Sequence, residues 1–233
     1  MRDRDHGVTI GPITPETALA AYRRGIFPMA PDRRSPLLHW IEPGLRGIVP
    51  LGGFHISRSL ARRIRRGGYE VAVDTAFAAV VEACADRPET WINPALTELY
   101  ATLFARGQAH SLEVWQDGAL AGGVFGIALG GAFFGESMVS RRTDGSKLAL
   151  AHLVAALRAG GFVLFDTQFL TPHLARLGAV EIPAAAYRRR LAAALRHTAR
   201  FPPPGPLAGV PGQSAAAGPA SASGSTHDST QTS

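Results

Sequence analysis

The stretch HSLEVWQDGALAGGVFGIALGGAFFGESMVS, residues 110–140, decides the fold of this chain. Two turn signals, Asp117-Gly118 and Gly130-Gly131, separate three apolar runs, and such dipeptides favour tight hairpin turns. The spacing therefore predicts an antiparallel meander of three strands. The last run contains a carboxylate, Glu136. It is a salt-bridged or protonated acid of the core, a solvent-facing acid on an edge strand, or the polar floor of an apolar pocket.

The order of elements around this meander indicates the fold class. From about residue 69 the pattern is β-α-α-β-β-β-α-β-α-β-α, with a helix over 146–159, a strand over 162–169 and a last helix over 184–197. A meander followed by alternating helices and strands predicts an α+β fold with helices on a mixed sheet. The layout resembles the N-acyltransferase fold of the acetyltransferase superfamily, a likeness that does not fix a reaction.

Composition shifts divide the chain into three parts. Residues 1–66 are short, punctuated segments that predict a small N-terminal domain, and residues 67–201 form the acyltransferase-like domain. From Pro202 to the end the chain is mainly Pro, Gly, Ala and Ser. Such a composition buries too little apolar area to offset the entropy of ordering, so we expect 202–233 to be a disordered tail.

Bulk properties exclude several classes of protein. Hydrophobic residues make up 46%, enough for a sizeable core, yet we find neither an unbroken apolar run of membrane-spanning length nor an apolar signal-peptide core. The lone cysteine, Cys84, excludes an internal disulfide. The eight histidines are scattered, so we expect no metal site. We expect a soluble cytoplasmic protein.

A basic helix is predicted over residues 56–66. Ile56, Leu60 and Ile64 are spaced four apart and share one helix face. The opposite face carries the arginines, namely Arg58, Arg62, Arg65 and Arg66. This face either binds nucleic-acid phosphates or is the solvated side of an amphipathic helix, and the absence of acids keeps the first interpretation open.

The strand that contains FDTQF places two polar side chains together. Side chains alternate along a strand, so Asp166 and Gln168 should share a face. A carboxylate beside an amide can orient an attacking amine and accept its proton, as acyl transfer requires. The alternative is that Asp166 caps the following helix or pairs with an arginine.

Aromatic and apolar residues suggest a pocket near these acids. In a regular strand Phe134, Glu136 and Met138 would share one face, while Phe133 would lie on the other. Trp40 and Trp91 lie in loop-like contexts, HWIEP and ETWINP, where aromatic rings can stack on nucleobases. The alternative is that each tryptophan fills a gap between two parts of the chain.

Seven stretches together resemble the leucyl/phenylalanyl-tRNA–protein transferase family. They cover about residues 15–195 in the family's order: YRRGIFPM, FHISRSL, ETWI, AHSLEVW, FFGESMVSR, DGSKLAL and DTQFLTPHLARLGAVEIP. The resemblance implies an enzyme that moves Leu or Phe from its tRNA to the N-terminal Arg or Lys of a protein, which marks that protein for regulated proteolysis. The implied partners are Leu-tRNA or Phe-tRNA and such proteins, with no cofactor, metal, membrane or DNA.

The family's functional positions carry over residue by residue. The resemblance implies that Asp166 and Gln168 are catalytic, with Asp166 acting on the amine directly or through Gln168. It implies substrate binding by the residues at matching positions: Trp40, Trp91, Phe133, Glu136, Met138 and Ser140. The arginines of helix 56–66 match the family's tRNA-binding cluster.

Two departures from the family pattern affect these expectations. This chain has His39-Trp40-Ile41-Glu42-Pro43 where many members have Trp-Trp-Ser-Pro, so contacts to adenine can differ. Val139 stands where Phe is common, which would widen the edge of the pocket.

Two other classes of function compete with this interpretation. An acyl-CoA-dependent N-acyltransferase would need a glycine-rich pyrophosphate loop before helix 146–159, and RRTDGSK lacks one. A non-catalytic RNA-binding module would gain little from acids inside apolar strands.

Overall fold

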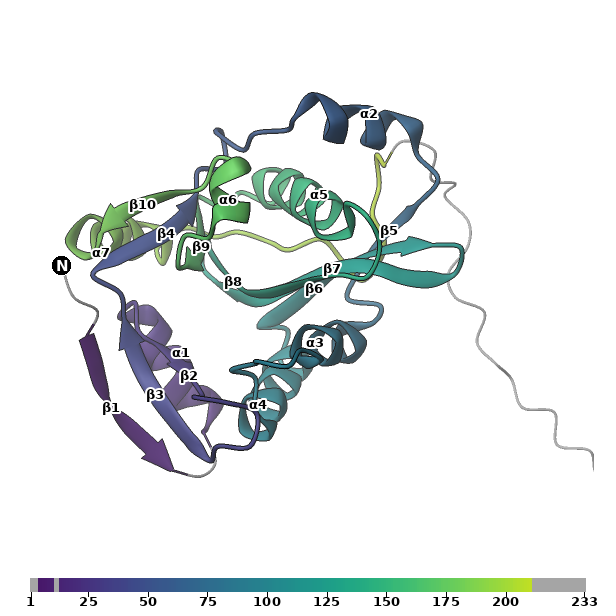
Figure 1. Ribbon diagram of the computed structural model, residues 1–233. Helices are drawn as coiled ribbons and strands as arrows, with labels where there is room; N and C mark the ends of the chain where they lie inside the picture. The colour runs from purple at the N-terminus through teal and green to yellow at the C-terminus, as the bar shows by residue number, and fades with distance from the viewer. Residues whose placement is uncertain (1–3, 11–12, 211–233) are drawn as a thin grey trace, which may run out of the picture.

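A computed structural model describes residues 4–10 and 13–210 of the chain. Its centre is an eight-stranded sheet in the order β10-β4-β9-β8-β7-β6-β5-β11 (Figure 1). Only β8 and β9 pair in parallel in this sheet, among the described residues. The mixed sheet with flanking helices confirms the predicted α+β class.

The meander forms as predicted. It consists of β6 (Ala109–Gln116), β7 (Ala119–Leu129) and β8 (Ala132–Ser140), paired antiparallel. Asp117, Gly118 and Gly130 have positive φ, as the two tight turns require. The remaining strands of this sheet are β4 (Leu45–Val49), β5 (Glu70–Val73), β9 (Leu164–Gln168), β10 (Val180–Pro183) and β11 (Gly205–Pro206).

Helices cover both faces of the sheet. On one side α5 (Gly145–Ala159) lies with α2 (Arg58–Arg66) and α6 (Pro172–Arg176) (Figure 1). On the other side lie α3 (Phe77–Ala85), α4 (Pro94–Ala105) and α7 (Ala184–Ala194). We call these the α5 side and the α4 side.

The N-terminal unit is smaller than the sequence predicts. It comprises β1 (Arg4–Ile10), α1 (Pro15–Arg23), β2 (Phe27–Met29) and β3 (Leu37–Glu42), and its strands form a separate sheet. By contrast, β4 pairs with β9 and β10 in the large sheet, and α2 packs beside α5. Residues 45–49 and 58–66, which the sequence assigns to the N-terminal domain, thus pair and pack with the large sheet.

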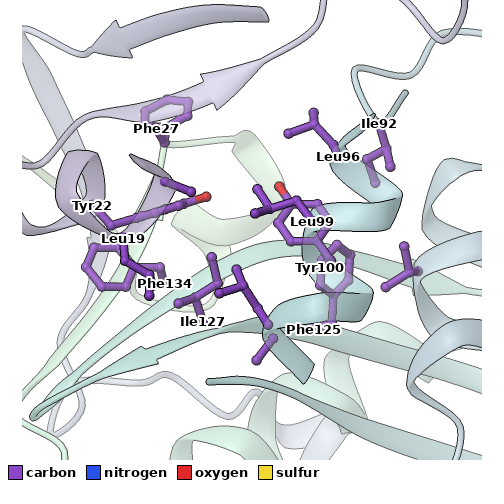
Figure 2. Close-up of a cluster of buried hydrophobic side chains, with 14 of the residues drawn as sticks. Leu19, Tyr22, Phe27, Ile92, Leu96, Leu99, Tyr100, Phe125, Ile127 and Phe134 are labelled. Atoms are coloured by element: carbon purple, nitrogen blue, oxygen red, sulfur yellow. The ribbon is translucent and has the colours of Figure 1, made fainter. Parts of the chain in front are cut away.

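The N-terminal unit shares a core with the large sheet. Figure 2 shows Leu19 and Tyr22 of α1 packed with Phe134 and Ile127 of the sheet. The hydroxyls of Tyr22 and Tyr100 reach towards each other from α1 and α4. Because this core is continuous, side chains of the N-terminal unit are held rigidly against β8.

The folded chain extends further than predicted at its C-terminal end. Residues 205–206 pair with β5, and Leu207 and Val210 pack on the α5 side. Phe201 stacks on Phe133 with ring centroids 5.5 Å apart. Residues 202–210 therefore belong to the fold because they cover apolar groups and add a strand. The rest of the predicted tail, 211–233, lies outside the described residues.

Candidate active site

A cavity of about 460 Å³ lies where β8 and β9 separate. The two parallel strands pair from Ala132–Leu164 to Phe134–Asp166, and the cavity is lined by residues beyond that point. Ligands commonly bind beyond the carboxyl ends of parallel strands. Its α5 side is apolar, with Val124, Met138, Leu150, Phe165 and Leu174. On its other side lie Phe27, Met29 and Trp91.

A β-bulge in β8 determines which side chains reach this cavity. Phe125 pairs with Ser137 and Gly126 with Gly135, so Glu136 is the extra residue. The bulge leaves Glu136 on the α4 side with Phe134 but moves Met138 to the α5 side. The expectation that these three residues share a face is therefore wrong, because it assumed a regular strand.

Glu136 is a buried acid between two tyrosines. Its Oε1 accepts from the hydroxyl of Tyr22 at 2.9 Å, and its Oε2 from that of Tyr100 at 3.0 Å. Burial raises the pKa of Glu136 to about 7, against the opposing effect of the two tyrosine hydrogen bonds. Burial also raises the pKa of both tyrosines, so they stay neutral donors. Glu136 can therefore exchange a proton near neutral pH.

Asp166 is fully buried and saturated with hydrogen bonds. Arg46 donates to it through Nε at 2.8 Å and Nη2 at 2.7 Å, and the hydroxyl of Tyr187 also donates. The backbone N–H of Gln168 donates the fourth bond, at 2.8 Å. Asp166 has no exposed surface and does not line the cavity. Asp166 therefore contacts Gln168 but does not reach the cavity, and it is paired with an arginine, as the alternative interpretation of this residue expects.

Arg46 is the partner that sequence reasoning missed. It is 1% exposed, its guanidinium lies over the rings of Phe27 and Tyr187, and its Nη1 donates to the carbonyl of Gly25 at 2.8 Å. Burial opposes its charge, but Asp166 outweighs that effect and raises the pKa of Arg46 above its ordinary value. The short apolar segment LRGIV contains one cation, and LFDTQ contains one acid. This complementarity of charge is the sequence feature that could have predicted the pair.

Gln168 is held in a strained turn at the end of β9. Its φ is 55°, in the left-handed region that a non-glycine residue seldom adopts. The N–H of Phe169 donates to the carbonyl of Thr167 at 2.6 Å across it, closing a three-residue turn. Gly47 faces this turn, and a Cβ there would lie 2.6 Å from the carbonyl carbon of Phe169. Gly47 leaves room for this turn because it has no side chain. Asp166 fixes the turn by accepting a hydrogen bond from the N–H of Gln168.

The amide of Gln168 then presents its oxygen to the cavity side of Glu136. With its nitrogen turned towards the backbone, the amide donates to the carbonyls of Gly135 at 2.9 Å and Thr167 at 3.1 Å. The reverse orientation offers only one contact of 3.4 Å to Glu136 Oε1, so we assign the first. The amide oxygen and the Glu136 carboxyl group are thereby neighbouring acceptors at the cavity.

The cavity gathers most, but not all, of the residues predicted to form the site. Glu136, Met138, Ser140, Trp91 and Gln168 all line it. Phe133 does not: it is 1% exposed and packs against Phe162, Phe165 and Phe201.

Trp40 also lies away from the cavity lining. It belongs to β3 and its Nε1 donates to Thr9 Oγ1 at 2.7 Å. Its ring packs against the core on the α4 side. This agrees with the alternative interpretation, in which the tryptophan fills a gap between two parts of the chain.

The basic helix presents its arginines to solvent. Leu60 is buried and the four predicted arginines are exposed. Arg63 differs from them, since its guanidinium lies over the ring of Tyr69 and bonds the carbonyl of Gly67. Ile56 precedes the helix, which begins at Arg58 with Ser57 as N-cap.

The described residues contain neither a metal-binding nor a membrane-spanning arrangement. No group of three or more His, Cys, Asp or Glu side chains in ranges 4–10 and 13–210 could hold a metal ion. No helix in the same ranges is both long and apolar enough to cross a bilayer.

Comparison with known protein sequences shows which family this chain is similar to. The family described as leucyl/phenylalanyl-tRNA protein transferase matches residues 48–192, and its N-terminal domain matches residues 11–44. A leucyl/phenylalanyl-tRNA–protein transferase from Cereibacter sphaeroides is 64% identical over 83% of this chain and 90% of its own length. One from Ruegeria pomeroyi is 62% identical over 81% and 90%.

A solved structure is also similar. The structure of L-PGS from Bacillus licheniformis has a TM-score of 0.40 at 13% identity and covers 70% of this chain and 58% of its own.

The family match and the curated relatives identify the chain as a transferase. The protein belongs to the leucyl/phenylalanyl-tRNA–protein transferase family. These relationships do not favour the acyl-CoA alternative.

Proposed function

We propose that this protein transfers leucine or phenylalanine from aminoacyl-tRNA to the N-terminal Arg or Lys of an acceptor protein. The observation that carries the proposal is the cavity between β8 and β9, with Glu136 and Gln168 at its polar centre. Its apolar α5 side suits a leucyl or phenylalanyl side chain, since such a pocket selects mainly by size and shape.

The reaction needs one nucleophile and one leaving group. The acceptor's α-amino nitrogen attacks the ester carbonyl carbon, a C–N bond forms, and the C–O bond to the terminal ribose breaks. The amine attacks only when neutral. Glu136, whose pKa is about 7, takes the proton that the ammonium group must lose. The ribose oxygen gains a proton as it leaves.

Gln168 orients the amine during this attack. Its amide oxygen accepts a hydrogen bond from the nucleophile, while its amide nitrogen is held by the carbonyls of Gly135 and Thr167. Asp166 acts behind it by fixing the turn. A group held rigidly in this way lowers the entropic part of the barrier.

Glu136 also supports a preference for cationic acceptors. It lines the cavity together with the apolar side chains and Trp91. The anionic form of this buried acid favours a positively charged N-terminal residue over a neutral one. The same reasoning disfavours acceptors that begin with Asp or Glu.

The direct test uses radiolabelled leucyl-tRNA and a peptide that begins with Arg. Label should enter this peptide, and much less should enter a matched peptide that begins with Glu. A folded sample that transfers no label to either peptide contradicts the proposal. Equal transfer to both contradicts the acceptor preference alone. A cytoplasmic location stays a prediction that cell fractionation can check.

A further inference from the structure

Two buried side-chain polar atoms among the described residues have no hydrogen-bond partner. They are Thr167 Oγ1 and His173 Nε2, and both residues line the cavity. Buried polar groups in proteins are nearly always paired. Their concentration at one place on the α5 side indicates a polar ligand group there, beyond what Glu136 and Gln168 serve.

His173 has two cationic neighbours. Burial lowers the pKa of His173, and the charges of Lys147 and Arg176 lower it further, so the imidazole is neutral beside two cations. Arg176 follows His173 by three residues in α6, which places both on one helix face. Lys147 lies in the first turn of α5 and pairs with Asp144 at 2.7 Å.

This cationic group adjoins the arginines of α2. The N–H of His55 donates to the carbonyl of Leu177 at 2.8 Å, which ties the segment before α2 to the end of α6. Arg176 precedes Leu177 and is exposed, and His55 precedes Arg58 by three residues. Figure 1 shows α6 and α2 on the same side of the sheet. Positive groups therefore occur on α2, on α6 and in the first turn of α5, all on the same side of the sheet as His173 of the cavity lining.

We propose that Lys147, His173 and Arg176 bind the ribose-phosphate backbone of the single-stranded 3′ end of the tRNA. The inference rests on the proposed function, and it assigns a second RNA contact, separate from the arginines of α2. Lys147 and Arg176 attract the phosphates. The neutral His173 donates to a phosphate oxygen or accepts from a ribose hydroxyl.

The test measures binding and does not depend on transfer. Two labelled RNA hairpins are compared by fluorescence anisotropy: one ends in the single-stranded 3′ end of tRNA, and one has the same duplex with a blunt end. The wild-type protein should bind the tailed RNA more tightly. Arg176→Ala and His173→Phe should each weaken tailed-RNA binding about fivefold and leave blunt-RNA binding unchanged.

A matched control separates this site from general charge. Arg158→Ala removes an exposed arginine from the far end of α5 and should leave both affinities unchanged. Folded Arg176→Ala protein that binds the tailed RNA like wild type, or loses equal affinity for both RNAs, overturns the inference. Normal binding discrimination with no peptide labelling would overturn the proposed function instead.

Discussion

The backbone N–H of Gln168 donates to Oδ1 of Asp166 at 2.8 Å, so a carboxylate with no exposed surface fixes the residue that reaches the cavity. The Asp166 carboxylate is held by Arg46 and does not line the cavity, so it cannot touch a substrate bound there. We therefore assign contact with the amine to Gln168 and a positioning role to Asp166.

Gln168→Ala should lower kcat for transfer by about 100-fold or more, because the attacking amine loses its oriented acceptor. KM for aminoacyl-tRNA should change little, since the apolar side and α2 are intact. Steady-state transfer to an Arg peptide measures both. Gln116→Ala, a change at the end of β6, is the matched control. An unaltered kcat in folded Gln168→Ala protein contradicts the role.

Arg46→Met should lower the free energy of unfolding by about 3–5 kcal/mol, because it leaves the Asp166 carboxylate buried without its cation. Asp166→Asn should cost a comparable amount. The double variant should lose less than the two single losses combined, since neither charge is then left unpaired. Urea unfolding measures all three, with Arg189→Met on α7 as the exposed control. Strict additivity would show that the pair is not coupled.

The stability of the wild-type protein relative to Glu136→Gln should fall as the pH rises from 5 to 8. The folded-state pKa of Glu136, about 7, lies above its ordinary 4.5, so the folded state holds the proton more tightly. That contribution is complete below about pH 4.5 and is lost as the pH passes 7. Urea unfolding of both proteins across this range measures the difference. A pH-independent difference contradicts the raised pKa.

The transfer rate should rise with pH through about 7 in the wild-type protein, as Glu136 becomes able to take a proton. Glu136→Gln should lower the rate and remove this dependence, although the amide preserves the size of the side chain. Single-turnover transfer across pH 5.5–8.5, a range of about three units around that pKa, resolves the profile. A variant that keeps the wild-type profile would assign the titration to another group, such as the acceptor amine.

Arg62→Ala combined with Arg66→Ala should weaken tRNA binding and reduce the slope of log K against log salt by roughly 1.8, if each arginine neutralises one duplex phosphate. Filter binding between 50 and 200 mM salt, the range over which roughly six to ten phosphate contacts change affinity strongly, measures the slope. Arg189→Ala with Arg190→Ala on α7 removes the same charge. If that control has an equal effect, net charge explains the binding and α2 is not a specific site.

Local patterns predicted most of the fold. The dipeptides Asp117-Gly118 and Gly130-Gly131 defined the meander, and the element order predicted for residues 69–197 is the one observed. The errors arose where pairing between distant segments decides the outcome. The apolar strand at 45–49 belongs to the N-terminal part of the chain but lies between β10 and β9 in the large sheet. The spacing of residues in the sequence does not reveal that these distant strands pair.

The residue types of the site could be predicted from the sequence, but the directions of their side chains could not. Glu136 and Gln168 were found because acids and amides are unusual in apolar strands. The bulge at Glu136 and the positive φ of Gln168 were not found, because both depend on tertiary contacts. Phe133 was misplaced for a related reason: residue type alone cannot tell a pocket wall from the core behind it.

Two buried side-chain hydrogen bonds join the N-terminal unit to the large sheet. Tyr22 donates to Glu136, and Arg46 donates to the carbonyl of Gly25. Separating the two parts would break both hydrogen bonds and expose the apolar core that the parts share. The two parts are therefore expected to melt in a single cooperative transition, and the slowest-exchanging amides should occur on both sides of residue 44. Neither part is then expected to fold without the other, because each would lose one side of the shared core.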